Sequence, residues 1–352
     1  MFRLRRSAAS LNAAALGLAL VVALVAAPET SLAVVARGGG AQPAAPLPAP
    51  ARLAGADRYE QAVLAAKAAF GTSATVFLAS GEKFPDALSA VSVAAQNDAA
   101  LLLTPAAVLL PTVGDEIAAL RPSVVVVVGG PASVSDEVLE QLSRRVRQAI
   151  VLRIGGADRF AVSRALIADA SVGFGTADEI FLANGGGFAD ALTASPAAAA
   201  GARVHPVLLV DGAEPAPSAE ETTVITGLGA RSAHLVGGLN SIGAALESSL
   251  RTGGLGGRRF AGADRFEVGV LVNQQAFGSA RVVYLASGLV FPDALSGGAL
   301  AAHEKAPLYV VPQNCVPQLV LDELVRLAPS RIVVLGGLAT LGPGVDALTP
   351  CA

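Results

Sequence analysis

The stretch that decides the fold is RLAGADRYE at residues 52–60, which returns as RIGGADRFA at residues 153–161 and as RFAGADRFE at residues 259–267. The second copy starts 101 residues after the first, and the third starts 106 residues after the second. Self-similarity at a regular spacing is the sequence signature of a repeat architecture. Roughly 100 residues per copy is enough for a unit with its own core, so we predict three tandem domains. Their predicted bounds are residues 52–152, 153–258 and 259–352.

Each copy continues with apolar strands at matching positions. The first strand ends in a small polar residue and Gly, and the motif F-[PA]-D-A-L-[ST] starts three residues after that Gly. In the three repeats, the first strand falls at residues 75–81, 179–185 and 282–288. The second falls at residues 100–104, 207–210 and 308–311. The third is an apolar run that ends at Gly130, Gly238 and Gly337. Continuously apolar strands that alternate with helix-length segments indicate parallel strands buried on both faces. We predict an α/β fold in which each repeat is a small open sandwich around its own core, and we expect the three to pack around a pseudo-threefold axis.

The composition restricts the partners that the chain can bind. Apolar residues make up 53% of the 352 residues and charged residues only 15%, which excludes a disordered chain. The formal net charge is −3, so bulk attraction to nucleic acid or to an anionic membrane does not organise binding. The chain has no Trp, which removes a surface on which many proteins stack sugars or bases. An anionic partner must therefore be bound at contact distance.

The N-terminus is typical of an export signal. Three arginines among the first six residues precede an apolar stretch over residues 11–27, and small residues follow it. We predict a cleaved signal peptide over residues 1–36 and a Pro/Gly/Ala linker over residues 37–51. An uncleaved signal anchor is the alternative, because the apolar stretch reaches about the lower limit of a membrane span. Cleavage gives a secreted protein without a membrane partner.

Three motifs in fixed order resemble those of the cell-wall-binding repeat type 2 family. These are R-x-x-G-A-D-R-[FY], then [SN]-G-x-x-x-[PA]-D-A-L-[ST], then a Gly-Gly turn, and they occur three times over residues 52–352. The resemblance implies three Rossmann-like or Toprim-like modules that form a compact pseudo-trimer within one chain, so we expect a monomer. It implies a non-catalytic, wall-associated protein that attaches non-covalently to an anionic secondary cell-wall polymer of a Gram-positive envelope. Family members usually carry a separate effector domain, which we do not expect here because the repeats fill the predicted mature chain.

Recurring polar residues within the motifs are the candidates for ligand binding. Asp57, Asp158 and Asp264 precede helix-like segments, so we predict that they serve as helix N-caps. The Arg after each of them either locks the turn or offers its guanidinium to a phosphate or carboxylate. The Asp of F-[PA]-D-A-L has a structural interpretation, since Asp is favoured in the first turn of a helix. It also has a ligand-binding interpretation, because it follows the end of a strand, where open α/β folds place ligands. The predicted ligand-binding residues are Arg58, Ser80, Asp86, Arg159, Asn184, Asp190, Arg265, Ser287 and Asp293.

The Gly-Gly turns offer a second place for an anion. A hydroxyl residue follows four positions after the first Gly of each pair, and the turn opens toward a helix whose first amides can receive a phosphate. The alternative is a tight turn with hydroxyl capping, and the G-x-G-x-x-G spacing of dinucleotide sites is missing. The residues are Gly129, Gly130 and Ser133, then Gly237, Gly238 and Ser241, then Gly336, Gly337 and Thr340.

An enzyme is the rival class of function. The recurring Asp residues could act as acid and base in a wall-active hydrolase, and a surface lattice or adhesion protein is a further alternative. Threefold recurrence favours repeated binding over a single catalytic site, and no G-x-S-x-G or H-E-x-x-H motif occurs. His205, His234 and His303 occupy unrelated repeat positions. We therefore predict no catalytic residues, no metal and no cofactor.

The two cysteines lie in the third repeat of a chain predicted to be exported. Cys315 and Cys351 are expected to form a disulfide, with two buried thiols as the alternative. Little sequence follows the last Gly-Gly pair, so the final element of the third repeat should be short. The bridge would tie down this shortened C-terminus.

Overall fold

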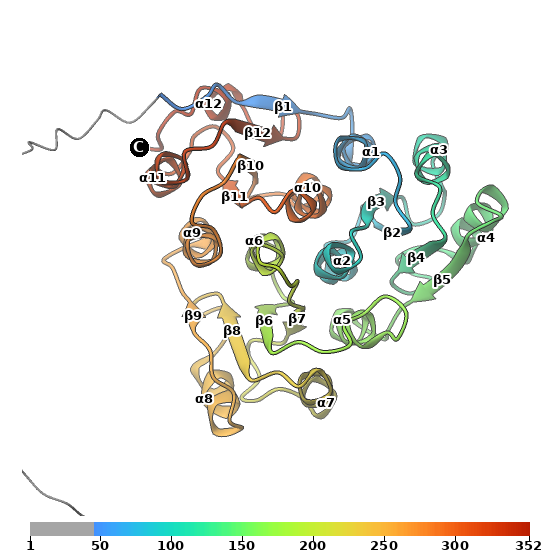
Figure 1. The fold of residues 1–352 in the computed structure, drawn as a ribbon, viewed down its shortest axis with the longest axis horizontal. Helices are drawn as coiled ribbons and strands as arrows, with labels where there is room; N and C mark the ends of the chain where they lie inside the picture. Colours follow the sequence, from blue (N-terminus) through green and yellow to red (C-terminus); the bar gives the residue numbers. More distant parts are fainter. Residues whose placement is uncertain (1–45) are drawn as a thin grey trace, which may run out of the picture. The chain divides into compact units, whose positions relative to one another are not determined.

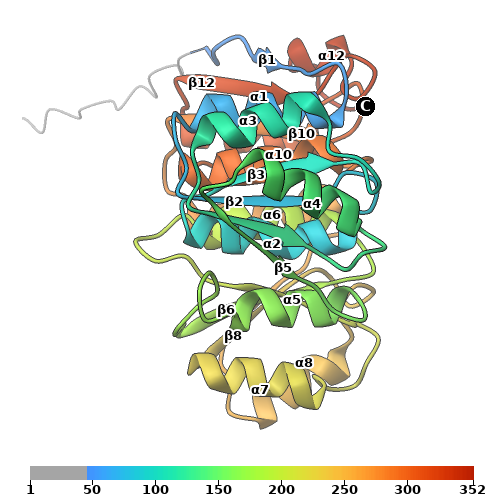
Figure 2. The same ribbon diagram turned by 90° about the vertical axis from the view of Figure 1, so that its right-hand side faces the viewer.

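Three parallel four-stranded sheets make up residues 46–352, the part of the chain that this computed structural model describes (Figures 1 and 2). The first sheet has the order β3 (Ala100–Thr104), β2 (Thr75–Ser80), β4 (Val124–Val128) and β5 (Ile150–Ile154). The second has the order β7 (Val207–Val210), β6 (Glu179–Asn184), β8 (Ser232–Val236) and β9 (Arg259–Phe260). The third has the order β11 (Leu308–Val311), β10 (Val282–Ser287), β12 (Arg331–Leu335) and β1 (Ala51–Leu53). The predicted signal peptide and most of the predicted linker lie outside the described residues.

Helices alternate with the strands along the chain. The first repeat holds α1 (Arg58–Ala69), α2 (Phe84–Gln96), α3 (Pro111–Leu120) and α4 (Asp136–Arg145). The second holds α5 (Arg159–Ala168), α6 (Ala189–Ala198), α7 (Ala219–Leu228) and α8 (Ala244–Thr252). The third holds α9 (Arg265–Ala276), α10 (Pro292–His303), α11 (Gln318–Leu327) and α12 (Pro343–Asp346), which has only four residues as expected. In the described residues, no helix has the length and apolar character needed to cross a membrane.

The apolar strands are buried because helices cover both faces of each sheet. In the first sheet, α2 packs on the inner face of β2, while α3 and α4 lie on the outer face (Figure 1). The last four valines of β4 are fully buried, and its partners β2 and β5 run parallel to it. Parallel strands covered on both sides need such continuous apolar runs. The predicted α/β fold class, with three parallel-sheet modules, is confirmed.

The fourth strand of each sheet overlaps the opening motif of another repeat. The segment that opens the second repeat forms β5 and pairs with β4 of the first repeat, and β9 pairs with β8 in the same way. The first strand, β1, pairs with β12 of the last repeat, with Arg52 opposite Val334. The sheet of each repeat is therefore completed by a strand from a neighbouring repeat. Three repeats that each lend a strand to the preceding sheet close into a ring.

The inner helices α2, α6 and α10 pack against one another at the centre of the ring (Figure 1). Their facing residues are mostly Ala, Ser and Gly, which bury little side-chain volume and let the helices approach closely. A Cβ on Gly298 of α10 would lie 3.2 Å from Cγ1 of Val91 in α2. The repeated contacts of these three helices give the expected pseudo-threefold arrangement.

A disulfide between Cys315 and Cys351 fastens the C-terminal segment to the start of α11. The Cα atoms of the two residues are 4.9 Å apart, and 36 positions separate them in the sequence. Backbone hydrogen bonds accompany the bridge, because Val316 N donates to Thr349 O and Cys351 N donates to Val316 O. The segment after α12 is thereby held against the third repeat.

Replacing both cysteines with serine is expected to lower the free energy of unfolding by about 3 to 4 kcal/mol, since the bridge closes a loop of intermediate length in the unfolded chain. Thermal and denaturant unfolding of the oxidised protein and the double variant would measure the loss. The single variant Cys315→Ser serves as a control, because it should lose as much stability as the double variant. Equal stability of oxidised and double-variant protein would contradict the prediction.

Candidate functional site

The predicted site residues gather at the carboxyl edge of the three sheets. Ser80, Asn184 and Ser287 are the last residues of β2, β6 and β10, the inner strands of the sheets. The Asp of each F-[PA]-D-A-L motif lies in the first turn of the inner helix that follows. Helix N-termini and strand ends therefore meet at the same edge, which is where open α/β sheets bind ligands.

At this edge each Asp carboxylate is joined to the Gly-Gly turn of its own repeat. Ser133 donates its hydroxyl hydrogen to Oδ2 of Asp86 over 2.6 Å, and Ser241 donates to Oδ2 of Asp190 over 2.9 Å. Thr340 makes the equivalent side-chain hydrogen bond to Asp293. The hydroxyl residues therefore hold a carboxylate, whereas the sequence suggested that they cap a helix. The two candidate sites of the sequence analysis are parts of one site.

The first glycine of each Gly-Gly pair is required by this arrangement. Gly129, Gly237 and Gly336 have φ angles of +95°, +129° and +106°, a region that residues with a side chain rarely adopt. A Cβ at any of these positions would also overlap Oδ2 of the Asp in the same repeat. The glycine thus lets the backbone turn approach the carboxylate.

Each of the three arginines binds a loop of its own repeat, and two of them also reach a neighbouring repeat. Nη1 of Arg58, Arg159 and Arg265 donates to the carbonyl oxygen of Gly81, Gly185 and Gly288, respectively, at 2.6 Å in each case. Burial raises the pKa of Asp190 in the second repeat, and Arg265 lies close enough to this carboxyl to oppose the rise. Arg58 acts on Asp293 of the third repeat in the same way, because the ring brings the first and last repeats together. The three arginines each hold a turn, and the charges of Arg58 and Arg265 face the carboxylate of the adjacent repeat.

A cleft of about 940 Å³ lies at the junction of the second and third repeats. Its lining includes Asn184, Asp190 and Ser241 from the second repeat and Arg265 from the third. Asn184, Asp190 and Arg265 are the predicted binding residues at this junction, and all three line the cleft. Ser241, the hydroxyl residue of the Gly-Gly turn, lines it as well. A cleft of this volume has room for several sugar units or phosphate groups.

The comparison with known proteins decides the family. The sequence pattern of the family described as "Cell wall binding domain 2 (CWB2)" matches residues 52–139, 153–247 and 259–346. The chain belongs to the cell wall binding domain 2 family. The resemblance noted from the sequence is confirmed, and the family indicates cell wall binding and association with the wall. All nine predicted site residues lie within the matched ranges.

Two curated proteins of Bacillus subtilis (strain 168) share this cell wall binding domain sequence. The chain is 29% identical over 257 residues to N-acetylmuramoyl-L-alanine amidase LytC, covering 73% of this chain and 49% of LytC. It is 27% identical over 266 residues to the protein named amidase enhancer, covering 76% of this chain and 35% of that protein. The chain therefore spans about half the length of the first relative and about a third of the second.

Two solved structures from Clostridium difficile have the same arrangement. Cwp6 superposes with a TM-score of 0.76 at 25% sequence identity, over 86% of this chain and 48% of Cwp6. Cwp8 gives a TM-score of 0.75 at 25% identity, over 86% of this chain and 51% of Cwp8. The described chain thus matches about half of each of these proteins.

Burial alters the acidity of two carboxyls in this cell wall binding domain. Desolvation raises the pKa of Asp190 and of Asp293 above the ordinary value of a carboxyl, although a hydroxyl hydrogen bond and a nearby Arg oppose the shift in both. Asp293 is only 8% exposed. Since the raised pKa favours the protonated form, each carboxyl stabilises the fold below about pH 4, and this contribution is lost as the pH rises through the folded-state pKa.

The double variant Asp190→Asn and Asp293→Asn is expected to flatten the dependence of thermal stability on pH between about pH 4 and pH 7. An amide oxygen still accepts the hydroxyl hydrogen bond, and the amide cannot ionise. The melting temperature measured at several pH values would show the change. The exposed Asp178→Asn variant is the control and should keep the slope of the wild-type protein. The same slope in the double variant and the wild type would contradict the prediction.

Ser80, Asn184 and Ser287 accept hydrogen bonds within the loops that they begin. Ser80 Oγ accepts from Glu82 N at 3.2 Å, Asn184 Oδ1 accepts from Gly186 N at 2.9 Å, and Ser287 Oγ accepts from Leu289 N at 3.1 Å. These bonds shape the turn whose glycine carbonyl accepts the hydrogen bond from the arginine. A ligand contact by these three side chains stays a prediction.

Aromatic and aliphatic side chains at the same edge were missed by the sequence analysis. The Arg265 guanidinium carbon lies 5.6 Å from the ring centroid of Phe188, and the rings of Phe188 and Phe291 are 6.1 Å apart. Leu239, which lines the cleft, is 62% exposed, and Leu338 at the corresponding Gly-Gly turn is 61% exposed. Apolar side chains beside cations suit the mixed surface of a sugar ring. The one sequence feature that could have identified Leu239 and Leu338 is that each directly follows a Gly-Gly pair.

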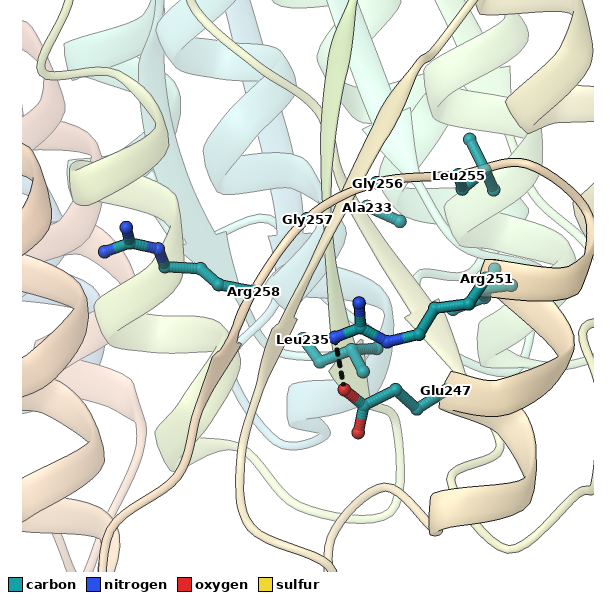
Figure 3. Close-up of a pocket in the computed structure, with 9 residues that line it drawn as sticks. Ala233, Leu235, Glu247, Arg251, Leu255, Gly256, Gly257 and Arg258 are labelled. Carbon is teal, nitrogen blue, oxygen red and sulfur yellow. Dashed lines mark hydrogen bonds and ion pairs between the residues drawn. The ribbon is translucent and has the colours of Figure 1, made fainter.

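A second hollow in the same domain, between α8 and the segment before β9, has no room for a polymer (Figure 3). Its volume is about 10 Å³, which is close to that of a single water. Arg251 and Glu247 close it with an ion pair of 2.9 Å, while Arg258 points away from this pair.

Histidines form no site that recurs among the repeats. Nε2 of His234 lies 3.4 Å from Oε2 of Glu179, and Nε2 of His205 lies 4.0 Å from the same atom. Burial lowers the pKa of His234, which keeps the imidazole neutral. No group of three or more metal-ligating side chains was found among residues 46–352.

Proposed function

We propose that this protein attaches non-covalently to an anionic secondary polymer of a Gram-positive cell wall through three clefts, one at each junction between repeats. The observation that carries the proposal is the recurrence of the same polar groups in all three repeats. Each repeat combines a carboxyl, a hydroxyl, a Gly-Gly turn and an arginine fixed to a backbone carbonyl. In this proposal the clefts bind and do not catalyse, and the protein is a secreted monomer.

The arginine supplies the positive charge for an anionic ligand. Arg58 and Arg265 each donate one N–H group to a glycine carbonyl, and a guanidinium carries further N–H groups that can donate to a phosphate or carboxylate oxygen. The carboxyls of Asp190 and Asp293 accept a hydroxyl hydrogen bond within the fold, so these hydrogen bonds hold each carboxyl against its own Gly-Gly turn. With a formal net charge of −3, the attraction acts only at contact distance, and salt should weaken it.

A purely binding role is supported by the family that the chain matches. LytC is named as an amidase, but the chain covers only 49% of it. The matched family is described as a cell wall binding domain, and its ranges contain every predicted site residue. The threefold recurrence is expected for a surface that meets a repeating polymer, because three weak contacts on one body add up to strong attachment.

Sedimentation of the protein with purified Gram-positive walls tests the proposal. We expect the protein to pellet with intact walls, to stay in solution with walls stripped of their anionic polymers, and to be released as salt increases. Incubation of the pelleted walls should free no new amino or reducing groups, which is the expected difference from an amidase or a glycosidase. Equal pelleting with stripped walls would contradict the anionic ligand, and steady release of wall fragments would contradict the non-catalytic role.

A further inference from the structure

A basic hollow occurs in the first repeat, away from the clefts. It has a volume of about 480 Å³ and is lined by Arg121, Arg144, Arg145, Arg147 and Gln148, among others. The arginines come from the C-terminal ends of α3 and α4 and from the loops that follow these helices. Those loops lead into the first residues of β4 and β5, so the hollow lies at the amino edge of the sheet. The clefts lie at the opposite, carboxyl edge.

Two of the four arginines have no carboxylate partner among the described residues. Arg144 pairs with Glu140 at 3.2 Å and Arg145 pairs with Asp115, so their charges are balanced within the fold. Arg121 forms no ion pair within residues 46–352, and Arg147 donates only to the backbone oxygen of Arg144 at 3.3 Å. Two uncompensated guanidinium groups therefore face the same hollow.

Arg121 occupies a backbone position that does not favour an arginine. It ends α3 in the left-handed region, with φ and ψ both at 52°, where glycine is the usual residue. The corresponding residue after Leu228 of α7 is Gly229, with φ of +72°. A strained residue at a helix end is often retained for function rather than for the fold.

The arginine cluster is absent from the second repeat, whose fold is the same. Aligning the buried Leu142 of α4 with the buried Leu250 of α8 places Thr252 and Gly253 at the positions of Arg144 and Arg145. A feature needed for folding would recur with the sheet and helices. The cluster therefore does not recur in the second repeat.

An apolar hollow adjoins the basic one. It has a volume of about 330 Å³, lies between α3 and α4, and shares Arg144 and Arg145 with the basic hollow. Its other lining residues include Leu109, Leu110 and Pro111. A ligand with a charged end and a larger organic part fits this pair of hollows better than a small free ion.

We propose that this pair of hollows binds a phosphate group, with the phosphoryl oxygens held by Arg121 and Arg147. Guanidinium groups bind phosphate through paired hydrogen bonds, and the three acceptor oxygens of a phosphate group can meet two guanidinium groups at once. The source is either free phosphate or a phosphate ester whose organic part lies along α3 and α4. The inference goes beyond the proposed function and does not rest on it, since none of the cleft residues takes part.

The test compares the wild-type protein with the double variant Arg121→Gly and Arg147→Gln by calorimetric titration. The probes are inorganic phosphate and glycerol 3-phosphate. We expect both probes to bind the wild type, and we expect the double variant to bind them at least tenfold more weakly. The variant should fold normally, because Arg121→Gly installs the residue that the second repeat has at this position. Thermal unfolding of the variant verifies this.

Arg251→Gln is the matched control, because Arg251 also ends a helix but lies outside the hollow. It should leave phosphate binding unchanged. Tighter binding of glycerol 3-phosphate than of inorganic phosphate supports an ester as the source, and equal binding supports free phosphate. Absence of binding to the wild type at millimolar probe, or equal binding by the double variant, would overturn the proposal. Wall sedimentation of the same variant stays normal if only the clefts carry the proposed function.

Discussion

A triple variant with tryptophan at Gly130, Gly238 and Gly337 is expected to lose wall binding by at least two orders of magnitude. These are the second glycines of the three Gly-Gly pairs. Gly238 lines the cleft between the second and third repeats, and the other two hold the same position at the other junctions. A Cβ has room at each of them, since its nearest neighbour would be at least 3.6 Å away, and none of the three has a positive φ. An indole ring would therefore fill the cleft while the turn is preserved.

Single tryptophan variants should lose binding by only about tenfold each, because two clefts still hold the polymer. Sedimentation with walls across a salt series would give the apparent affinity of each variant. Gly175→Trp is the matched control, since a Cβ there meets nothing within 4 Å and the residue lies outside the cleft. It should bind walls normally. Wild-type binding by a folded triple variant would exclude the junctions as the binding sites.

Removal of β1 should cause the largest loss of stability, on the order of 3 to 6 kcal/mol. This strand closes the ring through its pairing with β12, and Gly336 N donates to Leu53 O at 2.9 Å. Arg52 also donates to Gly336 O at 2.6 Å and forms an ion pair with Asp346 at 2.7 Å. Without β1, the edge of the buried strand β12 becomes exposed, which also favours aggregation.

A chain that begins at Gly55 would test this expectation against a control chain that begins at Pro46 and keeps β1. Thermal unfolding should show a melting temperature lower by about 10 °C or more in the shorter chain. Wall binding should weaken as well, because Arg58 follows β1 and faces Asp293 of the last repeat. Identical melting temperatures of the two chains would show that the ring does not depend on its closing strand.

Much of the local structure could be predicted from the sequence. The continuous apolar runs predicted where the strands lie and that both of their faces are buried, because a parallel strand covered on both faces has no polar side. The expected N-caps are confirmed, since Asp57 accepts from Tyr59 N and Glu60 N, and Asp158 and Asp264 cap α5 and α9. The disulfide was also expected from two cysteines in a chain predicted to be exported. The strands and the N-caps can be inferred from residues that are neighbours in the sequence, and the disulfide from the number of cysteines.

The composition of the site was partly predictable, but its assembly was not. The recurring Arg, Asp and Ser or Asn residues were identified, and so were the Gly-Gly turns with their hydroxyl residues. The bond from Ser133 to Asp86 joins residues 47 positions apart, which no local pattern reveals. The aliphatic side chains of Leu239 and Leu338 were missed because exposure depends on what the rest of the chain covers.

The sequence by itself determined the repeated elements of this protein, because strand, helix and cap preferences act over a few residues. Only the tertiary structure decided that β1, β5 and β9 complete the sheet of the adjacent repeat. The three copies of the opening motif are nearly alike, so their sequences fit either their own sheet or a neighbouring one equally well. The choice depends on which edge strand each segment can reach once the inner helices have packed. That packing closes the ring and places Arg58 and Arg265 beside carboxyls of other repeats.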